Sequence, residues 1–228
     1  MYSLRPSSPV SNHVVTNRSG DEAMTASRSE SFHPEILDAI RRMAYIAEYR
    51  KTNTLSHLDR IREYCLVIAT GMGLAAQEAQ IIAYASQLHD VGEIALPEQL
   101  VTRKEKLTSY EWDLVKRHPI IGAEILRGSP SAILQMGEMI ALTHHERWDG
   151  SGYPQGLKAE EIPIGGRICA LADVFDALTT RRPYKEEIPV EVAVGLLCDS
   201  SGQFFDPKLV DVFQAELDRI VEIRRMNI

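Results

Sequence analysis

Two adjacent histidines, His144 and His145, stand directly before a Gly-rich turn at 146–154 that carries Tyr153. Imidazole is a common metal ligand, and neighbouring imidazoles can each bind one of two neighbouring metal ions. The glycines of the turn allow the backbone to fold tightly beside whatever those ions hold. This stretch is therefore predicted to be the centre of a metal-dependent hydrolase.

Further imidazoles and carboxylates stand near the expected helix ends. A single histidine on an amphipathic helix is more often a surface or core residue, and Asp90 before Val91-Gly92 can be a turn residue. Asp173 is different, because the segment 168–175 around it is apolar nearly all round. A buried carboxylate costs several kcal/mol unless it is paired or binds a metal, so metal binding is favoured. The candidate ligands are His57, His89, Asp90, His118, His144, His145 and Asp173.

Five imidazoles and two carboxylates form the donor set of a binuclear site. Such donors suit Fe or Mn, and also Ni or Zn. Two divalent ions bridged by a carboxylate can activate water and clamp the oxygens of a phosphodiester during in-line displacement. The wide spacing and the absence of a CxxC pair exclude a structural zinc finger.

The elements that must position these residues are helices. Apolar residues at helical spacing predict an all-α fold with about eight or nine helices, while Gly and Pro predict loops at 91–107 and 146–164. Ser129-Pro130 is expected to begin one helix and Asp206-Pro207 the last. The helices are predicted at about 34–50, 55–70, 75–89, 108–118, 120–127, 129–145, 167–180, 189–197 and 206–224.

The composition limits the class of protein. Residues 1–30 are polar and lack an apolar period, which predicts a disordered N-terminal tail and a single domain over 31–228. A net charge of -7 argues against binding to polymeric nucleic acid. No apolar run approaches the roughly 18 residues of a membrane span, and no secretory signal is recognisable. Three widely spaced cysteines, expected to be buried and reduced, favour a cytoplasmic protein.

Several motifs carry a resemblance to a known family. The run Leu88-His89-Asp90-Val91-Gly92 resembles the signature of the HD phosphohydrolase superfamily, and Gly152-Tyr153-Pro154 resembles the GYP motif. Matching stretches continue at 156–157, 162–163, 167–168, 172–178, 182–185 and 202–207, so the resemblance covers about 35–215. The chain is thus similar to the HD-GYP domains, bacterial cyclic-di-GMP phosphodiesterases, and an HD-domain helical bundle with a Gly/Pro-rich GYP loop is expected.

The resemblance implies a role for each matching residue. One metal would be held by His57, His89 and Asp173, the other by His118, His144 and His145, with Asp90 as the bridge and a candidate catalytic residue. Tyr153 would line the pocket, and Arg182 and Lys185 would contact substrate phosphates, as their charges allow. The alternatives are loop packing for Tyr153 and a solvated face for Arg182 and Lys185. Glu146 and Asp149 are candidates for orienting a histidine or the glycine loop.

Two positions depart from the family pattern. Glu93 replaces the usual lysine after the His-Asp motif and is a second candidate catalytic residue. The alternatives for its carboxylate are to repel substrate, to pair with a nearby Arg or Lys, or to contact a metal. Asn53 occupies the position, four residues before His57, where some members carry an acidic ligand for a third metal. We therefore predict two metal ions.

The predicted activity is hydrolysis of cyclic-di-GMP to pGpG, with GMP as the alternative final product. One alternative is a signalling module of low activity that binds the nucleotide and acts through a partner such as a GGDEF-domain protein. Another is a phosphohydrolase for a different nucleotide, since the metals do not select the base. The helix at 34–50 can pair with a copy of itself to form a homodimer.

Overall fold

A computed structural model describes residues 32–52, 56–103, 105–180 and 187–226. Within these ranges the regular elements are helices, and the β pairing is limited to an isolated bridge between Ser201 and Phe205. The all-α prediction is confirmed. The predicted tail 1–30, together with Asn53, Arg182 and Lys185, lies outside the described residues.

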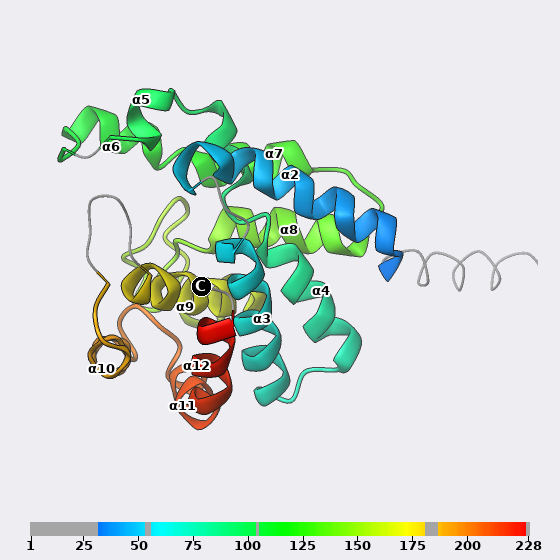
Figure 1. Ribbon diagram of the computed structural model, residues 1–228. Coiled ribbons are helices and arrows are strands. Elements are labelled where there is room, and N and C mark those ends of the chain that lie inside the picture. Colours follow the sequence, from blue (N-terminus) through cyan, green and yellow to red (C-terminus); the bar gives the residue numbers. More distant parts are fainter. Residues whose placement is uncertain (1–31, 53–55, 104, 181–186, 227–228) are drawn as a thin grey trace, which may run out of the picture.

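Figure 1 shows the helices in chain order. They are α2 (Pro34–Thr52), α3 (Ser56–Gly71), α4 (Ala76–Ser86), the 3-10 turn η2 (Val91–Ala95), α5 (Glu98–Val101), α6 (Ser109–Val115), α7 (His118–Leu126), α8 (Ala132–Thr143), the 3-10 turn η3 (Ala159–Glu161), α9 (Ile164–Thr179), α10 (Val190–Asp199), α11 (Pro207–Ala215) and α12 (Leu217–Met226).

Helix α9 lies at the centre of the bundle, packed against α3, α8, α10 and α11 (Figure 1). Its Phe175 is fully buried and meets two aromatic rings edge-on, Tyr64 of α3 at 5.5 Å and Phe213 of α11 at 5.0 Å between centroids. Edge-to-face pairs of this kind add to the free energy gained by burying the rings. The centre of α9, where Asp173 stands, is thereby fixed against its neighbours.

Some helix boundaries differ from the prediction. The expected helix at 129–145 begins at Ala132, with Ser131 rather than Ser129 as its N-cap. The expected final helix at 206–224 is two helices that meet at Glu216, and the break lets both Phe213 and Ile220 reach the core. The expected loop at 91–107 contains η2 and α5.

Two predicted helix starts are confirmed. Thr108 and Glu111 form a capping box at the start of α6, and the Asp206 side chain accepts a hydrogen bond from the Lys208 N–H at the start of α11. Pro119 stands in the first turn of α7, where proline is tolerated, so the chain breaks between α6 and α7 as expected.

Helix α2 packs against η2, α3, α4 and α5. Ile40, Ala44 and Ala47 lie on its buried face, and the carboxylate-bearing Glu48, only 2% exposed, continues that face. Ile46 and Tyr49 point away from the core and are more than half exposed. The helix therefore carries one acidic residue inward, toward the segment that follows α4.

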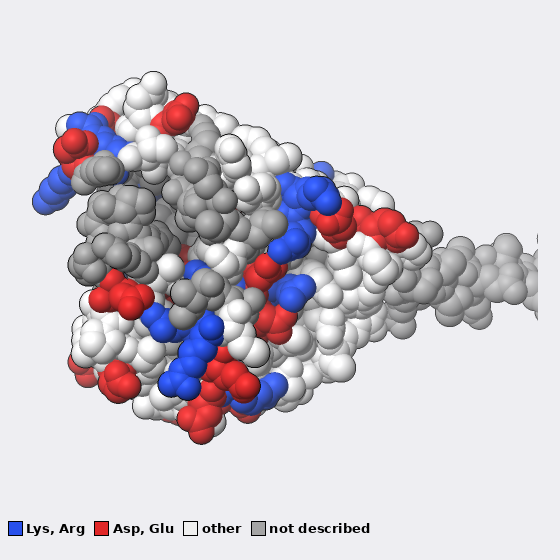
Figure 2. All heavy atoms as spheres, in the orientation of Figure 1, with Lys and Arg blue, Asp and Glu red and all other residues white. Residues whose placement is uncertain are grey.

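The surface shows no extended basic region on the face drawn in Figure 2, where acidic and basic side chains of the described residues are interspersed. None of the described helices has both the length and the apolar character that crossing a membrane requires. All three cysteines are free; Cys65 and Cys169 are buried as predicted, whereas Cys198 is half-buried.

Candidate metal centre

The seven predicted ligands converge from five parts of the bundle. His57 lies in the first turn of α3, and His89 and Asp90 follow α4. His118 begins α7, His144 and His145 follow α8, and Asp173 lies within α9. Residues separated by more than a hundred positions in the sequence thus meet at one point inside the bundle.

Asp90 stands between two groups of side chains. Its Oδ2 lies 3.5 Å from Nε2 of His89. Its Oδ1 lies 3.2 Å from Nε2 of His118 and 3.5 Å from Nε2 of His144. One carboxylate oxygen thus faces each group, which is the arrangement that a bridging ligand requires.

The first group contains His57, His89 and Asp173. The Asp173 Oδ1 lies 4.0 Å from Nε2 of His57 and 3.9 Å from Nε2 of His89. Asp173 is half-buried rather than buried as predicted, because its carboxylate faces this group instead of the core. The second group contains His118, His144 and His145, whose ligand atoms lie within 4.8 Å of one another and of Asp90.

The ring nitrogens that face away from the centre are hydrogen-bonded to the backbone. Nδ1 of His89 donates to the Ser86 carbonyl at 2.9 Å, and Nδ1 of His118 donates to the Val115 carbonyl at 2.8 Å. Nδ1 of His144 donates to carbonyls of α8 at 3.1 Å. A carbonyl can only accept, so each Nδ1 carries a proton, and a ring that is neutral presents the lone pair of its Nε2 to the centre, as metal binding requires.

His57 is oriented by a carboxylate instead. Its Nδ1 lies 2.7 Å from Oδ2 of Asp176, which is itself held by the guanidinium of Arg60 at 2.5 and 3.0 Å. Burial alone would raise the pKa of Asp176, but the hydrogen bonds from His57 and Arg60 outweigh it and lower that pKa. The carboxylate therefore stays ionised and fixes the orientation of the His57 ring.

The charges of the remaining imidazoles follow from their surroundings. Burial lowers the pKa of His144, and burial together with the neighbouring His144 and His118 lowers the pKa of His145 well below its usual value. Burial would also lower the pKa of His118, but the hydrogen bond to Asp90 outweighs it and raises that pKa. Neutral His144 and His145 have free lone pairs, so they are suited to bind a cation.

One buried atom without a hydrogen-bond partner among the described residues indicates that these residues fit a metal ion. His89 is 0% exposed, and its Nε2 has no hydrogen-bond partner within the described part of the chain. Buried polar atoms are rarely left without a partner unless an ion or a functional group occupies the space beside them. With its lone pair directed at Asp90 and Asp173, this nitrogen fits a divalent cation, and so does the surrounding N and O donor set.

Gly92 allows the chain after Asp90 to lie against the start of α7. A Cβ atom at this position would stand 2.1 Å from the His118 carbonyl oxygen and 2.4 Å from the Gly122 nitrogen. Only glycine permits such a close approach of two backbones. The distance between Asp90 and His118 therefore depends on the absence of a side chain at 92.

Glu146, which is 3% exposed, holds the segment that directly follows the turn at 146–154. Its carboxylate accepts hydrogen bonds from the backbone N–H groups of Gln155, Gly156 and Leu157 at 2.7 to 3.2 Å. Gly152 lies so close to this segment that a Cβ there would stand 2.5 Å from the Glu146 Cα. Asp149 contributes a local turn, in which Oδ1 accepts from the Ser151 N–H at 2.8 Å.

Tyr153 covers the second ligand group. Its ring stacks on His145 with centroids 4.7 Å apart and planes 23° apart. The ring of Trp112 from α6 meets Tyr153 edge-on at 6.2 Å. Burial raises the pKa of Tyr153, so its hydroxyl stays protonated and can donate a hydrogen bond to an anionic ligand.

Four residues near the centre were not among the predicted site residues. Asp176 and Arg60 orient His57, Trp112 contacts Tyr153, and Glu48 brings a carboxylate to His57 and His89. Two of them carried a signal in the sequence. Asp176 follows Asp173 by three positions on one helix face, and Glu48 has the spacing of Ile40 and Ala44 on the apolar face of α2.

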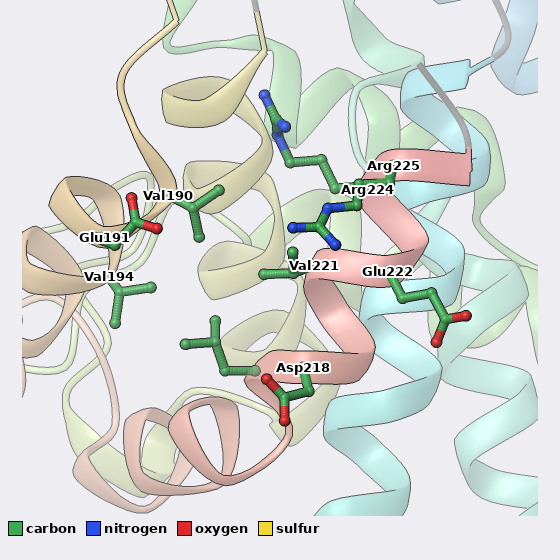
Figure 3. Close-up of a pocket in the computed structure, with 9 residues that line it drawn as sticks. Val190, Glu191, Val194, Asp218, Val221, Glu222, Arg224 and Arg225 are labelled. Atoms are coloured by element: carbon green, nitrogen blue, oxygen red, sulfur yellow. The ribbon is translucent and has the colours of Figure 1, made fainter.

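A surface groove between α10 and α12 lies apart from this centre (Figure 3). Val190 and Val194 of α10 face Val221 of α12 across it, and Arg224 lies at one end (Figure 3). Its lining includes none of the seven predicted ligands. Arg224 is also engaged elsewhere, donating to the Thr179 carbonyl at 2.6 Å, so the groove does not extend the site.

Comparison with known proteins identifies the family of this chain. The model of the HD domain family matches residues 41–209. A "Cyclic di-GMP phosphodiesterase response regulator RpfG" from Xanthomonas campestris is 44% identical over 186 residues, covering 80% of this chain and 49% of the relative. A "Cyclic di-GMP phosphodiesterase" from Thermotoga maritima is 42% identical over 196 residues, covering 86% of this chain and 52% of the relative.

A third relative differs in its named substrate. The "3'3'-cGAMP-specific phosphodiesterase 2" of Vibrio cholerae is 41% identical over 187 residues, covering 82% of this chain and 36% of the relative. The chain thus spans about half, or less, of the length of these curated relatives.

Two solved structures share the fold. An HDGYP protein from Bdellovibrio bacteriovorus, Bd1817, superposes with a TM-score of 0.60 at 18% identity, covering 89% of this chain and 75% of the other. The cyclic GMP-AMP phosphodiesterase V-cGAP3 of V. cholerae superposes with a TM-score of 0.57 at 20% identity, covering 82% of this chain and 49% of the other. At these identities the likeness shows the fold alone.

Proposed function

The chain belongs to the HD domain family, and from this premise we propose that it is a metal-dependent phosphodiesterase that hydrolyses cyclic di-GMP to pGpG, with GMP as the alternative final product. The observation that carries the proposal is the position of Asp90, with one oxygen toward His89 and the other toward His118 and His144. A carboxylate between two groups of imidazoles suits a pair of divalent ions that share it. The names of the two relatives above 40% identity that act on cyclic di-GMP support the choice of substrate.

Each of the two groups of ligands would hold one metal ion in the proposed site. His57, His89 and Asp173 would hold one ion, and His118, His144 and His145 the other, with Asp90 bridging. Two such ions, Fe or Mn in preference to Ni or Zn, supply activation of water and stabilisation of charge on the phosphodiester oxygens.

The remaining residues act on the substrate. Tyr153, kept protonated by burial, donates a hydrogen bond from the wall of the site. Arg182 and Lys185, outside the described residues, are proposed to contact phosphate oxygens, since a guanidinium and an ammonium suit such contacts. Glu93 faces the same space as Asp90 and is proposed to act through metal rather than on phosphate.

Turnover of cyclic di-GMP by the Mn- or Fe-loaded chain tests the proposal. The wild type should release pGpG, and Asp90→Ala should abolish release, because both ion positions lose their shared ligand. If the wild type binds cyclic di-GMP but releases no product with either metal, the enzyme proposal is wrong and a signalling module remains. Restoration of turnover by Glu93→Lys would then identify Glu93 as the cause.

A second candidate substrate is 3'3'-cGAMP, favoured by the V. cholerae relative at 41% identity. The two nucleotides differ in one base, and the metal centre contacts phosphate rather than base. A competition assay with equal amounts of both distinguishes them. A kcat/KM for 3'3'-cGAMP above that for cyclic di-GMP would reassign the substrate.

We also propose one domain over 31–228 and a cytoplasmic location. A homodimer through α2 is supported by the exposed Met43, Ile46 and Tyr49 on that helix. Binding of a GGDEF-domain protein by the turn at 146–154 is a proposal that rests on the HD-GYP resemblance. Sedimentation of the purified chain, alone and with such a partner, tests both interactions.

A further inference from the structure

Helix α6, which carries Trp112, lies at the edge of the molecule (Figure 1), and none of its residues is buried. Two contacts nevertheless join it to the second group of ligands. The Val115 carbonyl accepts the hydrogen bond from Nδ1 of His118 at 2.8 Å. The Trp112 ring meets Tyr153, which stacks on His145. The indole is therefore held at a defined place beside the metal centre.

The rings of His145, Tyr153 and Trp112 form an aromatic wall that begins at a predicted metal ligand and ends at the indole. Tyr153 lies face to face with His145, at 4.7 Å between centroids. Trp112 meets Tyr153 edge-on, with centroids 6.2 Å apart and planes 76° apart. An edge-on contact covers at most one face of the indole, and Trp112 is 45% exposed. Much of the indole surface is thus open to a flat ligand that enters the site.

A purine base is the ligand that suits this surface. Every nucleobase has a π face that stacks on aromatic side chains, and such stacking does not depend on the identity of the base. In a cyclic dinucleotide each base is joined through one ribose to the phosphates, so a phosphodiester bound at the metal centre brings its base to the wall of the site. Both candidate substrates of the proposed function carry two purines.

We propose that Trp112 is a substrate-binding residue that stacks on one purine base of the cyclic dinucleotide and so positions the adjacent phosphodiester at the metal centre. This inference rests on the proposed function and extends it from the phosphate to the base. Because stacking reads the face of a base and not its edge, Trp112 should serve cyclic di-GMP and 3'3'-cGAMP alike. It should also favour nucleotides over phosphate compounds that have no base.

Trp112→Ala tests the stacking through kinetics of the Mn-loaded full chain. KM for both cyclic dinucleotides should rise about 5- to 150-fold, with kcat little changed, because the lost contact is present in the ground state and the transition state alike. Inhibition by inorganic phosphate, which has no base, should be unchanged. Trp112→Phe should keep most of the affinity and Trp112→Leu should not. Tyr110→Ala is the matched control, because Tyr110 lies on the same helix and is 72% exposed, and it should behave as wild type.

Fluorescence provides a measurement that does not require turnover. The Zn-loaded full chain is titrated with GMP, and the difference between wild type and Trp112→Phe isolates the emission of Trp112 from that of Trp148. GMP should quench this emission, whereas ribose 5-phosphate, which has no base, should not. Quenching by GMP in a chain that does not turn over cyclic di-GMP would overturn the proposed function and leave the stacking site standing.

Two results would overturn the stacking site. An unchanged KM in Trp112→Ala, without quenching by GMP in wild type, would show that no base reaches the indole. Equal losses of cyclic di-GMP affinity, phosphate inhibition and Mn²⁺ affinity in Trp112→Ala would show that Trp112 only supports Tyr153 and the ligand beneath it. Turnover of cyclic di-GMP by wild type would leave the proposed function intact in both cases.

Discussion

Asp176 accepts a hydrogen bond from Nδ1 of His57 at 2.7 Å while Arg60 holds its two oxygens from the other side. All three side chains are at least nine-tenths buried. The imidazole thus presents Nε2 to the metal centre with a fixed orientation, and the buried guanidinium is neutralised by the same carboxylate.

Asp176→Asn is therefore expected to affect both stability and metal binding. Removal of one partner from a buried ion pair costs about 3–5 kcal/mol, and loss of a group that orients a metal ligand lowers affinity about 10–100-fold. Urea unfolding and Mn²⁺ titration measure the two effects. Asp206→Asn is the control. Asp206 forms an ion pair with Arg167 at 2.6 Å, and this pair includes none of the predicted metal ligands, so the variant should lose stability and keep its Mn²⁺ affinity.

Gly92→Ala is predicted to destabilise the fold. Its Cβ would stand 2.1 Å from the His118 carbonyl oxygen, so the backbones of η2 and α7 must separate, at a cost of about 1–3 kcal/mol. Mn²⁺ affinity should fall as well, because Asp90 and His118 move apart. Gly195→Ala is the control. A Cβ atom at this position would meet no atom within 4 Å, and the residue lies within α10, so the variant should be slightly more stable than wild type. Equal melting temperatures for the two variants would contradict the close-approach argument.

Glu146→Gln should loosen the segment 155–157, which follows the turn at 146–154. A glutamine has one carbonyl oxygen in place of two carboxylate oxygens, so the three backbone donors compete for it, with a loss of about 1–3 kcal/mol. Hydrogen exchange should become faster at Gln155, Gly156 and Leu157. Glu161→Gln, which removes a carboxylate from the exposed Lys158 N–H, should leave these three amides unchanged.

The capping box at Thr108 and Glu111 predicts a pH effect. Hydrogen bonds from the Thr108 backbone and side chain lower the pKa of Glu111. A carboxyl group with a lowered folded pKa stabilises the fold above its unfolded value of about 4.3 and loses that contribution as pH falls through the folded value. The melting temperature of wild type should thus exceed that of Glu111→Gln near neutral pH, and the difference should shrink on acidification. A constant difference across this range would show that ionisation of Glu111 makes no contribution.

Metal removal should lower stability. Ligands that bind only the folded state stabilise it by about 2.7 kcal/mol at a hundredfold excess over Kd. The ions would link segments from α3 to α9, which are together only in the folded bundle. Chelation of the Mn-loaded chain should therefore lower its melting temperature, and Asp90→Ala should show little further change on chelation. An identical melting temperature with and without chelator would show that the ions do not bind the folded state.

The candidate ligands could be selected from the sequence more readily than the helix boundaries. His89-Asp90 and His144-His145 are distinctive residue pairs, so they could be recognised without knowing the packing. Glu48 and Asp176 carried only the helical spacing noted above, and packing was needed to show that Glu48 turns toward His57 and His89 and that Asp176 turns toward His57 and Arg60. The break at Glu216 lacks glycine and proline; it follows from the need of Phe213 and Ile220 to reach one core. Ser129 and Ser131 are equally good caps by composition; the helix begins after the second, whose side chain makes no capping hydrogen bond among the described residues.

The Glu146 carboxylate holds the segment 155–157 through backbone N–H groups, so these hydrogen bonds do not constrain the side chains at 155 and 157. Any residue except proline can supply the same donors. The shape of this loop and the chemistry it displays are therefore separable: the side chains at 155 and 157 can change while the hydrogen bonds to Glu146 remain.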